Sequence, residues 1–238
     1  MTYDDYLEAR KLYIIVGIFY NDRIFGEIHA LLRLLNLPTW EWIQTIHDNQ
    51  NKFLPSIKKV FDDFISDTKA ELWDTPEELI KDVSKSVNKY HNGELGGNLI
   101  YKYRSKAIVQ HFSDVHLIAF DNLRKYLKNK NVNVENLINQ LEEFSKLQKG
   151  DIFDTEIDVV KNYDYDLIKM IKNAAEMREA SNIDAIKYPV TVNIKHSNKQ
   201  KELINRQLEF FGKDNAGLSM LISRFPLKRF YREANQLK

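Results

Sequence analysis

The chain has 238 residues, of which 43% are hydrophobic and 29% are charged, and its formal net charge is +1. These proportions are typical of a folded domain rather than a disordered chain, and the small net charge gives no general bias towards nucleic acid or membranes. The sequence contains no cysteine, which excludes disulfides, thiolate catalysis and cysteine-ligated zinc or iron–sulfur sites within this chain.

Neither a signal peptide nor a membrane span is evident. Residues 1–5 lack the basic and apolar segments of a signal peptide. The longest apolar run, Leu12–Tyr20, is much shorter than the roughly 20 residues that a membrane-spanning helix needs. We therefore expect a cytoplasmic protein without a membrane partner.

Residues 1–149 have the patterns of successive helices, which predicts a multi-helix bundle. Thr2 is a plausible N-cap, and the wholly apolar run Leu12–Tyr20 is typical of a helix enclosed in the middle of a bundle. Apolar residues from Ile57 to Leu72 follow helical spacing. The segment Thr75-Pro76-Glu77-Glu78 has the features of a helix start, and this helix should continue to about Tyr90.

A long helix is predicted from Leu99 to about Leu127, and a further helix should end at Gly150. The inward positions of the long helix are predicted by its apolar spacing to be Tyr103, Ala107, Phe112, Val115, Ala119 and Leu123.

The pattern changes after residue 150. β-Branched and aromatic residues predict a strand within Ile152–Tyr165 and another at Val190–Ile194. Helices are predicted near 166–177, from the capping box at Ser197 to Gly212, and near 216–224. The expected fold is therefore mainly α: a helical bundle over 1–149, followed by a small α+β part over 150–238 that packs on it and holds two or three short strands.

No complete active site is evident. None of the histidines follows the spacing of a zinc or di-iron motif, and no serine lies in a nucleophile motif. We interpret the six histidines as ordinary structural or surface residues; they are His29, His47, His91, His111, His116 and His196.

The glycine cluster at 93–98 has two interpretations. Glycines before a helix can present backbone amides to a phosphate. However, the cluster matches no phosphate-binding motif, and Glu94 would repel an anion. A turn between two helices is the plainer interpretation.

The segment from Val190 onwards is basic. It holds six Lys and four Arg against three Glu and one Asp, and the residues of its basic tail are Arg224, Lys228, Arg229 and Arg232. Basic residues among aromatics are typical of nucleic-acid binding, but also of a helix that docks on a protein domain. Because the charge is dilute, we expect docking through Phe225, Phe230 and Tyr231.

Five motifs follow one another along the chain: Tyr6-Leu7-Glu8-Ala9-Arg10, Phe19-Tyr20-Asn21, Trp73-Asp74-Thr75-Pro76-Glu77-Glu78-Leu79, Gly93-Glu94-Leu95-Gly96-Gly97-Asn98-Leu99 and Tyr101-Lys102-Tyr103-Arg104-Ser105-Lys106-Ala107. Together they resemble the helical C-terminal region of radical S-adenosylmethionine proteins that carry a cobalamin-binding domain. The family's Cys-x-x-x-Cys-x-x-Cys motif has no counterpart here. The resemblance therefore implies that the iron–sulfur cluster, S-adenosylmethionine and possibly cobalamin are bound by upstream domains of a parent protein.

On this resemblance, the chain is an accessory domain that packs on the barrel of a radical enzyme, towards its substrate, and is not catalytic by itself. The residues expected to face the barrel or the substrate are Gly93, Glu94, Gly96, Gly97, Asn98, Tyr101, Lys102, Tyr103 and Arg104. The alternative is a free-standing module that binds protein or nucleic acid through the basic tail. A third hypothesis is a standalone enzyme of unknown class.

Overall fold

The computed structural model describes residues 2–91, 98–176 and 182–237. It is 71% helical, with ten α-helices and one three-stranded antiparallel sheet in the described residues. Every strand of that sheet follows residue 150. The predicted fold class, a mainly α chain with a small α+β C-terminal part, is therefore confirmed.

The first helix begins at the N-cap that the sequence predicts. Thr2 caps the first helix, because its Oγ1 accepts a hydrogen bond from the backbone N–H of Asp5 at 3.1 Å. The helix ends before Asp22, which has a φ of 55°. The elements are α1 (Tyr3–Phe19), η1 (Asn21–Arg23), α2 (Gly26–Leu34), α3 (Thr39–Asp48), η2 (Gln50–Lys52), α4 (Pro55–Ala70), α5 (Pro76–His91), α6 (Leu99–Asn129) and α7 (Glu135–Lys149).

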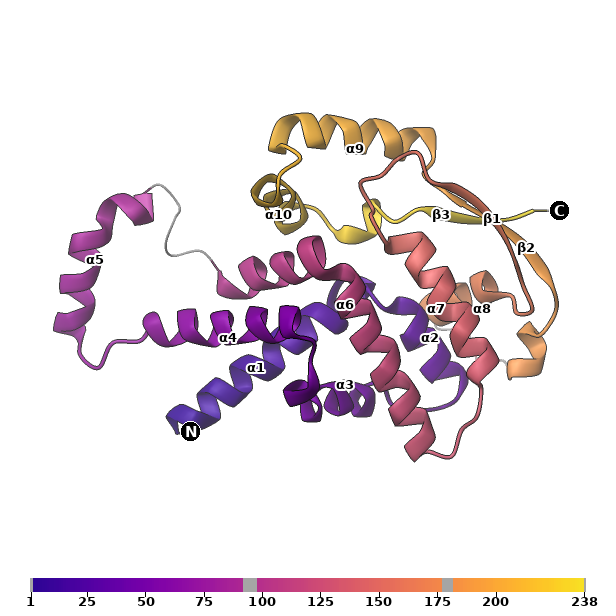
Figure 1. Cartoon of the computed structure of the whole chain (residues 1–238), viewed down its shortest axis with the longest axis horizontal. Coiled ribbons are helices and arrows are strands. Elements are labelled where there is room, and N and C mark those ends of the chain that lie inside the picture. Colours follow the sequence, from indigo (N-terminus) through magenta and orange to yellow (C-terminus); the bar gives the residue numbers. More distant parts are fainter. Residues whose placement is uncertain (1, 92–97, 177–181, 238) are drawn as a thin grey trace.

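The long helix α6 runs through the middle of the bundle (Figure 1). It packs against α1, α3, α4, α7 and α10 (Asn215–Arg224). Trp42 of α3 is fully buried and donates a hydrogen bond from Nε1 to the carbonyl oxygen of Ala119 at 3.2 Å. Of the predicted inward positions only Phe112 is partly rather than fully buried, so helical spacing correctly predicted the inner face of α6.

Two predictions about apolar segments differ from the structure. Tyr13 and Tyr20 are exposed, so α1 has a solvent-facing side and is not enclosed on all sides. Tyrosine can present its hydroxyl to water while its ring packs on neighbours. The sequence alone therefore does not decide whether the tyrosines of this run are buried or exposed. Leu72 lies beyond the end of α4 and is also exposed.

The second part contains the sheet. Its elements are β1 (Asp158–Tyr163), α8 (Leu167–Ala175), η3 (Ile183–Ile186), β2 (Val190–Lys195), α9 (Asn198–Phe211), α10, η4 (Leu227–Arg229) and β3 (Glu233–Leu237). The strand β2 lies in the middle, with Val160 opposite Asn193 on one side and Asn235 opposite Asn193 on the other. The strand β3 arises from the basic tail, where the sequence showed no strand pattern.

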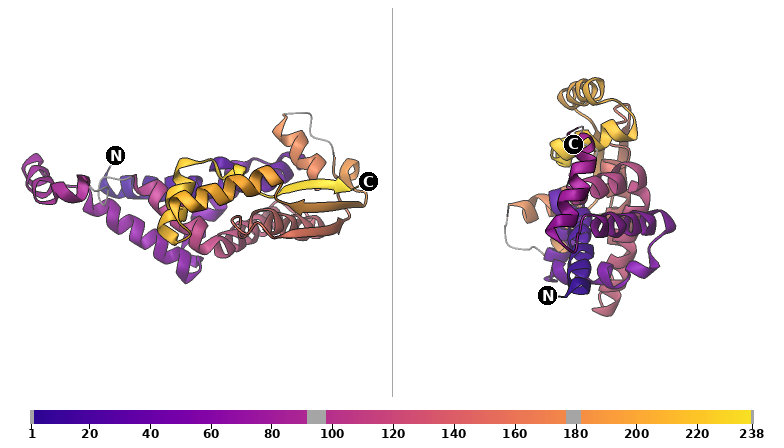
Figure 2. Two further views of the ribbon diagram at one scale, coloured as in Figure 1. Left: turned by 90° about the horizontal axis from the view of Figure 1, so that it is seen from above. Right: turned by 90° about the vertical axis from the view of Figure 1, so that its left-hand side faces the viewer.

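The two parts share one hydrophobic core. Buried residues of both belong to a single cluster, α8 packs on α2, and α10 packs on α6. Figure 2 shows an elongated molecule with α5 standing away at one end and the sheet near the other. The predicted boundary at residue 149 therefore marks a change of secondary structure within one packed body.

Candidate functional site

The start of α6 holds those predicted interface residues that the structure describes. Gly93, Glu94, Gly96 and Gly97 lie outside the described residues. Asn98 caps α6, because its Oδ1 accepts a hydrogen bond from the backbone N–H of Ile100 at 2.9 Å. Tyr101 has half of its surface exposed. Lys102 is also exposed, and its Nζ lies 2.7 Å from Oδ2 of Asp67.

Tyr103 and Arg104, predicted to face a partner, are instead buried inside this chain. The hydroxyl of Tyr103 donates to Oδ2 of Asp67 at 2.6 Å, and burial together with this carboxylate raises the tyrosine's pKa. Arg104 forms an ion pair with Asp22. The two side chains therefore hold α6 against α4 and against the turn at η1, and they do not lie on a surface that a partner can reach.

The basic tail likewise contains both exposed and buried side chains. Arg224, Lys228 and Arg229 are exposed, and the guanidinium of Arg224 lies over the ring of Phe211, 5.7 Å from its centroid. Arg232 has only 1% of its surface exposed. A phosphate backbone could reach three of the four predicted cations but not the fourth.

Arg232 is bound by backbone carbonyls instead. Its two terminal nitrogens donate to the carbonyl oxygens of Leu147 at 3.0 Å, Gly150 at 2.6 Å, Asp151 at 2.6 Å and Asp154 at 3.0 Å. These carbonyls belong to the end of α7 and the turn after it. Arg232 therefore joins that turn to the last strand, and its role is structural.

The aromatic residues of the tail pack on this chain's own core. Phe230 is fully buried, and its ring centroid lies 5.6 Å from that of Phe153 and 6.4 Å from that of Phe225. Phe225 and Tyr231 are partly buried against the same core. The predicted docking through these aromatics thus takes place within the molecule, because the tail folds back over the bundle.

Helix α5 carries a group of exposed apolar side chains. Leu79, Ile80 and Val87 are 38%, 65% and 51% exposed, and their spacing places them along one stripe of the helix. Polar and charged residues fill much of the remaining surface of α5. Figure 1 shows this helix apart from the body of the molecule, so no described element covers its apolar stripe.

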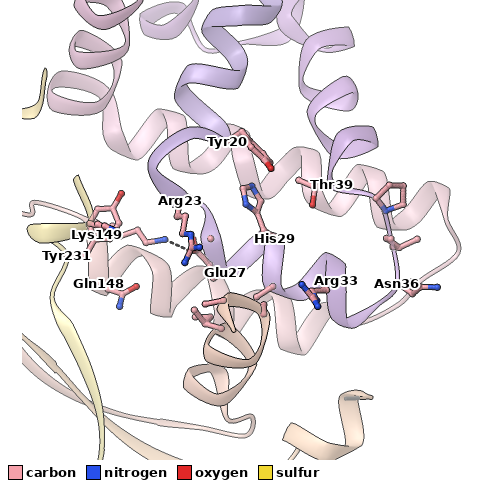
Figure 3. A pocket seen from close by; sticks show the side chains of 18 residues that line it. Tyr20, Arg23, Glu27, His29, Arg33, Asn36, Thr39, Gln148, Lys149 and Tyr231 are labelled. Atoms are coloured by element: carbon pink, nitrogen blue, oxygen red, sulfur yellow. Dashed lines mark hydrogen bonds and ion pairs between the residues drawn. The ribbon is translucent and has the colours of Figure 1, made fainter. Parts of the chain in front are cut away.

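A large cavity lies where the bundle meets the C-terminal part (Figure 3). Its volume is about 850 Å³, within the range of small-molecule sites. Its walls come from segments distant in sequence: the region from Tyr20 to Thr39, the end of α7, one side of α8, and Lys228 and Tyr231. Because no single segment carries the cavity, no sequence pattern indicated it.

A buried ion pair lies at one end of the cavity. Lys149 and Glu27 are almost fully buried and form an ion pair with each other. Ser145 donates to Oε1 of Glu27 at 2.5 Å, and Lys149 donates to the carbonyl oxygen of Ile24 at 2.7 Å. Burial lowers the pKa of Lys149, although Glu27 opposes this effect.

His29 lines the cavity between its two ends, as Figure 3 shows. Its ring packs on Tyr20, with centroids 4.9 Å apart, and edge-to-face on Trp42. Burial lowers the pKa of His29 to about 4, so the imidazole is neutral at pH 7. It therefore adds a polar surface but no charge to the cavity.

The described residues contain neither a metal-ligand cluster nor a membrane-spanning helix. Nowhere in 2–91, 98–176 or 182–237 do three or more histidine or acidic side chains come together as a metal site would require. No described helix is both long enough and apolar enough to cross a bilayer.

Comparisons with known proteins identify no relative. No protein-family model matches the chain, and neither the curated proteins nor the solved structures contain a significant match.

Proposed function

We propose that this chain is a non-catalytic accessory domain that packs through α5 on the barrel of a radical S-adenosylmethionine enzyme. The observation that carries the proposal is the uncovered apolar stripe of Leu79, Ile80 and Val87. Exposed apolar stripes on an isolated helix are typical of surfaces that bind another protein. The parent enzyme is expected in the cytoplasm.

The sequence resemblance supplies the identity of the partner. The motif from Trp73 to Leu79 includes the start of α5, and the motif from Tyr101 to Ala107 lies in α6, the next helix. One motif of the resemblance thus overlaps the helix that carries the uncovered surface.

The chain's composition limits what it contributes to such an enzyme. Without cysteine it cannot hold a cysteine-ligated iron–sulfur cluster. In this proposal the cluster, S-adenosylmethionine and any cobalamin are bound by upstream domains, and this chain contributes a docking surface.

A first test is the coding sequence upstream of Met1. The proposal expects it to encode a barrel with a Cys-x-x-x-Cys-x-x-Cys motif. An upstream reading frame without such a motif would contradict the proposal that the parent protein is a radical enzyme.

A second test locates the contact in the full-length parent enzyme. A photo-reactive benzophenone amino acid is placed at Ile80 and, as a matched control, at Val160, which is 55% exposed on β1. We expect cross-links from position 80 to peptides of the barrel and none from position 160. Cross-links to the barrel from neither position would contradict docking through α5.

The alternative function, nucleic-acid binding by the basic tail, is supported less well. Arg232 is withdrawn from the surface, and Arg224 lies over an aromatic ring of its own chain. Binding to tRNA that weakens with salt, and that Lys228→Gln and Arg229→Gln abolish, would favour this alternative instead.

A further inference from the structure

The cavity of Figure 3 carries an excess of positive charge. Its lining includes Arg23, Lys149 and Lys228 against one carboxylate, Glu27. Lys149 and Glu27 neutralise each other in a buried pair. The excess therefore comes from Arg23 of η1, just before α2, and from Lys228 of η4.

Two of these cations lie at the same end of the cavity. Arg23 belongs to η1 and Lys228 to η4, and these two short elements pack against each other. No described carboxylate pairs with either side chain. Figure 3 shows Arg23 beside Lys149 and Tyr231, while Arg33 and Asn36 lie towards the opposite end.

The backbone holds Arg23 in an unusual conformation. Asp22 and Arg23 have φ values of 55°, a left-handed conformation that costs a residue other than glycine roughly 1–2 kcal/mol. The ion pair between Asp22 and buried Arg104 ties this turn to α6. The packed helix thereby fixes the turn that presents Arg23 to the cavity.

Apolar side chains form another wall of the cavity. Ile171 and Ala174 of α8 line it together with Ala30 and Leu37. A fully hydrated inorganic anion would leave this wall without a partner. A molecule with an anionic group and an apolar body would contact both surfaces.

We propose that this cavity binds a small organic anion, whose phosphate, carboxylate or sulfonate group is held by Arg23 and Lys228 and whose apolar body lies against α8. An arginine guanidinium can donate two parallel hydrogen bonds to such a group. The assignment does not depend on docking through α5, because the cavity and that helix are separate features.

The test uses two fluorescent probes with the whole chain. The anionic probe is 8-anilinonaphthalene-1-sulfonate, and the neutral probe is N-phenyl-1-naphthylamine, which has the same rings without the sulfonate. Fluorescence titrations are made with Arg23→Gln and Lys228→Gln. Arg229→Gln is the matched control, since Arg229 is exposed next to Lys228 but does not line the cavity.

We expect each cavity variant to weaken binding of the anionic probe about tenfold, the equivalent of one charge-assisted hydrogen bond. Binding of the neutral probe should change less than twofold, and Arg229→Gln should change neither. Both substituted side chains lie at the surface, so the variants should fold normally, as circular dichroism can verify. Equal loss of both probes, or no loss of the anionic one, would overturn the proposal.

A second pair of variants shows where the probe binds. Ala174→Trp fills the cavity and should reduce binding of both probes, whereas Ile80→Ser with Val87→Ser removes the apolar stripe of α5 and should leave binding unchanged. If instead the α5 variant abolishes binding of the anionic probe, the probe reports the exposed helix and the cavity proposal is wrong.

Discussion

At the scale of single residues, Arg232 has the most clearly defined role. A fully buried guanidinium is costly unless its donors are satisfied, and here four backbone carbonyls accept from its two terminal nitrogens. These carbonyls lie at the end of α7, where a helix leaves its last carbonyls without intrahelical partners, and in the turn after it. One side chain thus allows the last strand to pack beside the end of the bundle.

Replacing this guanidinium should destabilise the whole chain. Arg232→Gln removes most of the donors to these four carbonyls and truncates a fully buried side chain, so we expect the free energy of unfolding to fall by roughly 3 kcal/mol or more. Urea denaturation measures the change. The control Arg229→Gln alters an exposed side chain and should stay within about 0.5 kcal/mol. An Arg232→Gln variant as stable as the native chain would show that water replaces the lost donors.

His116 makes stability depend on pH. It is buried in α6, with its ring centroid 4.7 Å from that of Phe120, and burial lowers its pKa from 6.5 to about 4. Between pH 6.5 and pH 4, His116 is therefore protonated in the unfolded chain but neutral in the folded chain. Its contribution to stability is complete above pH 6.5 and is lost as the pH falls towards 4.

We expect His116→Phe to remove this component of the pH dependence. One pKa unit corresponds to about 1.4 kcal/mol, so the native chain should lose on the order of 3 kcal/mol more than the variant between pH 7 and pH 4. Urea denaturation of both proteins across this range gives the difference. Carboxylates and His29 titrate in both proteins and cancel. Parallel pH profiles would contradict a neutral, buried His116.

At the scale of elements, α5 differs from the other helices of the bundle. Thr75 starts it as predicted, with its Oγ1 accepting from the backbone N–H of Glu78 at 3.2 Å. Little of the helix is buried. An isolated helix of this length is only marginally stable in water. The stability of α5 therefore comes mainly from its own sequence, whereas the stability of α6 comes from packing in the core.

Hydrogen exchange should separate these two helices. We expect the amides from Leu79 to Asn88 to exchange by local opening, with protection at least 1,000-fold below that of the amides from Val115 to Leu123, because opening α5 exposes almost no core. Mass spectrometry of peptic fragments measures both segments in one sample. Equal protection of the two segments would mean that another surface covers α5.

At the scale of the whole molecule, the single core predicts a single unfolding transition. The buried residues of β2 belong to the same cluster as those of α1 and α6, and contiguous cores of this kind usually unfold cooperatively. The three tryptophans, Trp40, Trp42 and Trp73, all lie in the first part. Their fluorescence therefore reports on the bundle alone.

A change in the sheet should be visible in this fluorescence. Ile194 of β2 is fully buried, and Ile194→Ala should lower the free energy of unfolding by about 2–5 kcal/mol. The tryptophan-detected midpoint should shift accordingly. Val160→Ala, at an exposed position of β1, is the control and should shift it little. An unchanged midpoint in Ile194→Ala would indicate two parts that unfold independently.

Features that depend on neighbours within about four residues could be predicted from the sequence. The caps at Thr2, Thr75 and Ser197 and the helix end at Gly212 are local hydrogen-bond patterns, and helical periodicity also placed Tyr103 inside. The family resemblance, by contrast, offered Tyr103 and Arg104 as interface residues, because the local sequence does not reveal their partners Asp67 and Asp22.

Tertiary structure alone decided the remaining features. Arg232 is about 80 residues from its carbonyl partners, β3 forms only because β2 supplies its hydrogen bonds, and the cavity joins η1, α2, α7, α8 and η4. A polar side chain is stable inside a protein only where distant groups satisfy it. Its burial is therefore a property of the assembled chain, whereas a helix cap or an apolar stripe is a property of the segment that contains it.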